Sequence, residues 1–180
     1  MSKTIFSDIE SLRILRELEQ SNKKLTELQG VINAAVESYH TESPWNGPHC
    51  VDSSCVTYSI DKKRLLDIPT NIVVYSVKRG TELIWGFQRR KYDNYTRSLE
   101  LLLLPDSVKV IMNNAFSECT HLKDVAFGNG LRVIGNYAFS ECSFTTLLLP
   151  ESIYSIGDYA FAGNEKLQTI YIPSTIVNLG

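Results

Sequence analysis

The stretch that decides the fold is Ile134-Gly135-Asn136-Tyr137-Ala138-Phe139, because the chain repeats it twice with small changes. The other copies are Ile111-Met112-Asn113-Asn114-Ala115-Phe116 and Ile156-Gly157-Asp158-Tyr159-Ala160-Phe161. The three closing phenylalanines are 23 and 22 residues apart. A fixed period of this length is typical of a solenoid, in which each repeat forms one coil and contacts only its neighbours. The sequence therefore predicts a stack of coils, which presents a binding surface rather than a deep catalytic pocket.

Other columns of the sequence repeat with the same period. The strand-ending residues are Leu104, Phe127, Leu149 and Ile172, each followed by a proline or a glycine and then by an apolar pair three residues apart. We expect each unit to run through a strand, a turn, a short second strand and a turn that carries the alanine and phenylalanine of the motif. One unit cannot bury its own apolar side, so stacked copies share one core.

This pattern resembles the BspA-like leucine-rich repeat, a bacterial class often found on surface or secreted proteins. Residues 99–180 match the pattern closely, residues 58–69 resemble the β-hairpin that often precedes such repeats, and residues 72–98 resemble a degenerate repeat. The N-terminal 50 residues do not match it. The resemblance implies binding to a protein or to matrix, and it implies no catalytic residues.

The first 40 residues predict an amphipathic helix. Ser7-Asp8-Ile9-Glu10 fits a capping box at its start. Apolar residues then follow at spacings of three and four, with one break at Ser21: Ile14, Leu18, Leu25, Leu28, Ile32, Ala35 and Tyr39. Such a seam is typical of a helix that folds back on its own domain, and a dimerising coiled coil is the alternative.

These patterns together predict an α+β protein, in which a short leucine-rich-repeat β-solenoid follows an N-terminal helical segment. Residues 1–40 form a helical cap or an oligomerisation segment, and residues 41–57 form a linker. The solenoid covers residues 58–180, with the hairpin and degenerate repeat in 58–98 and regular repeats in 99–180.

Composition and charge narrow the range of partners. The net charge is −2, whereas a general nucleic-acid binder needs a strong positive field. No apolar run approaches the length of about 18 residues that a membrane span requires. Charged residues interrupt residues 1–20, so no signal peptide is predicted. We expect a cytoplasmic protein if Met1 is native, although the resemblance suggests the cell surface or secretion.

The chain shows no pattern typical of catalysis or cofactor binding, and we expect neither an enzyme nor a cofactor. The three histidines, His40, His49 and His121, stand apart, and no nucleophile elbow or phosphate-binding glycine loop is present. Cys50 and Cys55 have a loose spacing without a second ligand pair, so we expect no metal site. A disulfide between them would form only in an oxidising compartment.

Two repeat columns are expected to be structural. Cys119 and Cys142 share a column with Asn164, where a small buried residue fits a tight turn. Asn136 and Asp158 precede the tyrosines of the motif, and their side chains are expected to bond backbone amides.

Residues 85–97 offer an alternative function, because they interleave aromatic and basic residues: Trp85, Phe87, Arg89, Arg90, Lys91, Tyr92, Tyr95 and Arg97. Such residues can stack on bases and contact phosphates. The segment also coincides with the degenerate repeat, where an insertion would carry exposed charge. A nucleic-acid-associated regulator is therefore the first alternative, although nucleic acid is not the expected partner.

The principal predicted site is the outer face of the first strand in each repeat. Side chains alternate along a strand, so two columns point outward. These columns are Leu101, Asp124, Thr146 and Thr169, and then Leu103, Ala126, Leu148 and Tyr171. The second column is apolar, and a contiguous exposed apolar stripe usually marks an interaction site. We expect a non-catalytic interaction module that binds a protein ligand or its own subunit.

The end of the sequence suggests a second alternative. The chain stops at Gly180, inside a fourth unit and before its alanine-phenylalanine turn. An open end exposes strand edges and favours association. We expect either a homodimer, formed through this end or through the N-terminal helix as a structural assembly module, or a chain cut from a longer protein.

Overall fold

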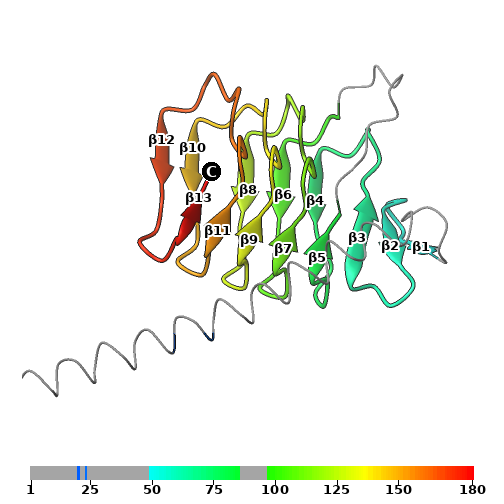
Figure 1. The fold of residues 1–180 in the computed structure, drawn as a ribbon. Helices are drawn as coiled ribbons and strands as arrows, with labels where there is room; N and C mark the ends of the chain where they lie inside the picture. Colours follow the sequence, from blue (N-terminus) through cyan, green and yellow to red (C-terminus); the bar gives the residue numbers. More distant parts are fainter. Residues whose placement is uncertain (1–19, 21–22, 24–48, 86–96) are drawn as a thin grey trace, which may run out of the picture. The chain divides into compact units, whose positions relative to one another are not determined.

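The computed structural model describes Gln20, Lys23, residues 49–85 and residues 97–180 (Figure 1). The chain divides into two compact units, Met1–Gly47 and Pro48–Gly180. Gln20 and Lys23 are helical. The rest of the helix predicted over residues 1–40 lies outside the described residues, and so does the part of the predicted linker that precedes residue 49.

The second unit is a β-solenoid, as the repeats predict, and its strands form two faces (Figure 1). One face carries the first strand of each coil: β4 (Val74–Ser76), β6 (Leu101–Leu103), β8 (Asp124–Ala126), β10 (Thr146–Leu148) and β12 (Thr169–Tyr171). The other face carries β3 (Arg64–Asp67), β5 (Leu83–Ile84), β7 (Val110–Ile111), β9 (Val133–Ile134), β11 (Ser155–Ile156) and β13 (Asn178–Leu179). Paired strands in both faces are parallel from β3 onward. Because equivalent residues pair, each coil lies in register on the one before it.

An antiparallel hairpin begins the sheet that contains β3. Strand β1 (His49–Val51) pairs with β2 (Thr57–Ser59), and β2 pairs with β3. Strands β2 and β3 lie in the region of the hairpin expected over residues 58–69. The boundary of the linker predicted over residues 41–57 is corrected, since residues 49–51 are a strand. The chain can reverse between β1 and β2 because Cys55 adopts a left-handed φ of 62°.

The core consists of the inward columns of every coil. Phe139 is fully buried and lies between Phe116 and Phe161, with ring centroids 5.2 and 5.8 Å away. Phe127 and Phe144 meet the same ring edge-on. The phenylalanines of the repeated motif therefore form a continuous aromatic stack along the inside of the solenoid.

Polar side chains join successive coils in two of the repeat columns, although the sequence predicts bonds to backbone amides only for the column of Asn136 and Asp158. Asn136 N donates to Asn113 Oδ1 at 2.8 Å, and Asp158 N donates to Asn136 Oδ1 at 3.0 Å. In the other column, Cys142 Sγ donates to the Phe116 carbonyl at 3.3 Å, and Asn164 Nδ2 donates to the Phe139 carbonyl at 2.8 Å. Both columns satisfy backbone groups between coils.

Replacing Gly135 by alanine is expected to lower the free energy of unfolding by about 1–3 kcal/mol. A Cβ at this position would lie 2.6 Å from Asn113 N and 2.5 Å from Asn113 Oδ1. Urea unfolding followed by circular dichroism measures the effect. Adding Asn113→Ala removes the side-chain clash but not the backbone clash, so the double variant should remain less stable than Asn113→Ala alone. A Gly135→Ala variant as stable as the native chain would contradict this account of the motif's glycine.

Candidate protein-interaction face

The candidate site is the outer surface of β6, β8, β10 and β12, here called the strand face. In the first three of these strands the middle residue, Leu102, Val125 or Leu147, is buried in the core. The residues on either side must therefore point away from the core, because side chains alternate along a strand.

The four strands that carry the eight predicted residues lie side by side (Figure 1). Leu101 pairs with Asp124 and Leu103 with Ala126 across β6 and β8, while Thr146 pairs with Thr169 and Leu148 with Tyr171 across β10 and β12. Seven of the eight are exposed, and Leu101 is half-buried. The largest apolar exposures are 69% for Leu148, 52% for Tyr171 and 37% for Leu103.

The face extends one strand further than the sequence predicted. Val74 on β4 is 56% exposed and pairs with Leu101, and Ser76 pairs with Leu103. The repeat period did not show this, because Val74 and Leu101 are 27 residues apart instead of 22 or 23. The apolar pattern of Val73-Val74-Tyr75 was the one signal that could have identified this strand.

The hydrogen-bond ladder of the strand face is interrupted in its middle. Strands β4, β6 and β8 form one sheet and β10 and β12 form another, and across the residues that the structure describes no ladder joins β8 to β10. Just before these strands, Ser143 N donates to the Leu122 carbonyl at 2.9 Å and links the two coils. The interruption lies directly beside Asp124 and Ala126.

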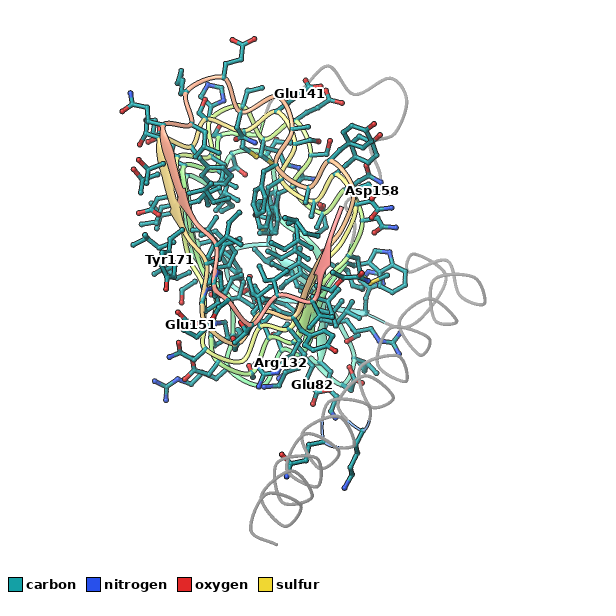
Figure 2. All side chains as sticks on the ribbon, turned by 60° about the vertical axis from the view of Figure 1, so that its left-hand side comes forward. Glu82, Arg132, Glu141, Glu151, Asp158 and Tyr171 are labelled. Carbon is teal, nitrogen blue, oxygen red and sulfur yellow. The ribbon has the colours of Figure 1, made fainter. Side chains whose placement is uncertain are left out.

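Three charged side chains at the margins of the face, Glu100, Lys123 and Glu151, are engaged with neighbours. Lys123 Nζ lies 2.8 Å from Glu100 Oε2, and this hydrogen bond lowers the pKa of the Glu100 carboxyl. Tyr171 donates its hydroxyl to Glu151 Oε1 at 2.9 Å, which raises the pKa of the tyrosine (Figure 2). The Tyr171 ring is thereby held on the outer surface of the sheet, with its polar end toward Glu151.

The basic and aromatic segment 85–97 lies outside the described residues except at its two ends. Trp85 is buried at 2% exposure. Arg97 donates to the Ile68 carbonyl and lies 3.2 Å from Asp67 Oδ1. Arg97 is therefore engaged within the solenoid, which gives this end of the segment a structural role.

The described ranges hold no group of three or more histidine, cysteine or acidic side chains arranged to bind a metal ion. Among the residues that the structure describes, there is no helix long and apolar enough to cross a membrane.

The repeats match a known family. The model of the BspA type leucine rich repeat region matches residues 89–180 in six copies. This chain belongs to that family. BspA-type repeats are non-enzymatic interaction or surface modules in general, because a solenoid offers an extended face rather than an enclosed site. No curated protein sequence matches the chain with significance.

Two crystal structures of bacterial proteins have a fold similar to this solenoid. A leucine-rich repeat protein from Bacteroides ovatus is 27% identical with a TM-score of 0.52, over 72% of this chain and 33% of that one. The pneumococcal vaccine antigen PcpA is 20% identical with a TM-score of 0.58, over 77% of this chain and 38% of that one. The chain therefore spans 33% and 38% of the length of these two relatives.

Proposed function

We propose that the strand face binds a protein partner and that the chain acts without catalysis. The observation that carries this proposal is the exposed apolar column formed by Leu103, Ala126, Leu148 and Tyr171 on four neighbouring strands. Large apolar side chains aligned in this way are costly to expose to water, so a surface that retains them is typical of an interface.

Several features of the face favour a protein over other partners. Its exposed residues are leucine, valine, tyrosine, threonine, serine and alanine, with one carboxylate, and they present no cationic cluster for phosphates. The solenoid also supplies a rigid backbone beneath them, since the strands are held by parallel ladders on either side of the interruption. A rigid aromatic and aliphatic surface loses little conformational entropy when it is covered.

The partner is a separate protein or a second copy of the chain, and the two cases differ in solution. If copies associate through the strand face, sedimentation at several concentrations will show a dimer that the variants below convert to a monomer.

The cytoplasmic location expected from residues 1–20 stays a prediction, as does the role of residues 1–40 as a helical cap or oligomerisation segment.

Introducing Leu103→Asp and Leu148→Asp together is expected to reduce partner capture at least tenfold, because two carboxylates would be buried against an apolar partner. Native chain and variant are immobilised side by side, and proteins bound from the native organism are quantified by mass spectrometry. The matched control is Ile60→Asp with Val177→Asp, since these side chains are 63% and 61% exposed and lie off the strand face. A folded double variant that captures the same proteins and assembles like the native chain would refute the proposal.

A further inference from the structure

Asp124 is the single charged residue in the two outward columns of the strand face, and its position there is unusual. It is exposed, and within residues 49–85 and 97–180 no cation forms an ion pair with it. Its neighbour in sequence, Lys123, is engaged with Glu100. A partner that covered this carboxylate without supplying a cation would leave a desolvated, unpaired charge in the interface, which is strongly unfavourable.

The smallest side chain of the apolar column, that of Ala126, lies two residues after Asp124, on the same strand β8. Ala126 pairs with Leu103 on β6, and β10, which carries Leu148, lies on the other side of β8 (Figure 1). Residues two apart on a strand are separated by about 6–7 Å. The methylene stem of a long basic side chain spans a similar length and packs well on apolar surface while its charged end stays polar.

Arginine suits the Asp124 carboxylate better than lysine. Its planar guanidinium presents five donors in a fixed fork, and two of them can bond both oxygens of one carboxylate.

We propose that the strand face recognises a protein segment in which one arginine is flanked by apolar residues. The arginine stem lies over Ala126 between Leu103 and Leu148, and the guanidinium pairs with Asp124. The flanking apolar side chains cover Leu148 and Tyr171 on one side and Leu103 on the other. This inference rests on the proposed function of the strand face and specifies the partner that the face selects.

A phage-displayed library of random 12-residue peptides tests this directly, with the full chain as bait. We expect peptides selected by the native chain to be enriched in arginine next to apolar residues. The enrichment should disappear with Asp124→Asn and persist with Glu165→Gln, a matched control that removes one exposed carboxylate away from the face. Peptides enriched in apolar residues without a basic preference would overturn the arginine proposal and leave the proposed function intact.

A thermodynamic cycle then assigns the contact to Asp124. The strongest peptide and its version with arginine replaced by glutamine are titrated into the native chain and into the Asp124→Asn variant. We expect the replacement to weaken binding at least tenfold on the native chain and much less on the variant. An equal loss on both chains would show that the arginine contacts another group and would overturn the proposal. Equal recovery of peptides by native chain and by Leu103→Asp/Leu148→Asp would overturn the proposed function itself.

Discussion

Replacing Phe139 by alanine is expected to lower the free energy of unfolding by about 3–5 kcal/mol, which is much of the stability of a domain this size. The ring is fully buried and contacts Phe116 and Phe161 face to face and two further phenylalanines edge-on. Its removal therefore opens a cavity in the middle of the stack, where the coils above and below cannot close without losing their register. Urea unfolding followed by circular dichroism measures the loss.

The exposed tyrosine stack provides a control for Phe139. Tyr137 and Tyr159 belong to the same motif and stack with centroids 5.1 Å apart, but they are 43% and 64% exposed. Tyr159→Ala should therefore cost less than about 1 kcal/mol. Equal losses for Phe139→Ala and Tyr159→Ala would contradict the view that the stack of buried rings dominates the stability of the solenoid.

A second large effect is expected at Asp52, whose side chain is only 6% exposed. Its Oδ2 accepts from the Tyr75 hydroxyl at 2.7 Å, and its Oδ1 accepts from the backbone N–H groups of Ser54 and Val56. The Tyr58 hydroxyl lies 2.6 Å from that of Tyr75, so Tyr58 donates to Tyr75, which donates to Asp52. Asp52→Ala leaves several of these donors unsatisfied, and we expect a loss of about 2–4 kcal/mol.

The contribution of Asp52 should depend on pH. Burial raises the pKa of its carboxyl, but the hydrogen bonds from Tyr75, Val56 and Ser54 and the charge of Lys78 outweigh burial, and the pKa falls below its ordinary value of 3.8. The stabilisation is therefore fully present above the pKa of the unfolded chain and is lost as pH falls through the pKa of the folded chain.

Asp52→Asn isolates this pH dependence from that of other carboxylates. The difference in unfolding free energy between native chain and variant should be constant near neutral pH and shrink below about pH 5. Urea titrations at stepwise lower pH measure it. A difference that stays constant down to the acid transition would show that the Asp52 charge does not contribute.

The repeat columns explain why most of the solenoid could be predicted. Alternation along a strand is a local property, so the inward and outward columns follow from the spacing of residues such as Leu102 and Leu103. The hydrogen-bonding role of Asn136 was predicted for a similar reason, since it recurs one coil after Asn113. The first coil was harder to recognise because β4 precedes β6 by 27 residues, which breaks the period.

By itself, the sequence determined the coil period, the family, the buried columns and the eight residues of the strand face, because stacked coils require the same residue type at each register position. Only the tertiary structure decided that Val74 extends the face, that the ladder stops beside Asp124, and that Asp52 meets Tyr75. The physical reason is that these features depend on contacts between coils. Strand pairing and buried hydrogen bonds join residues whose separation in the sequence does not follow the repeat period. No pattern in the sequence therefore predicts these contacts.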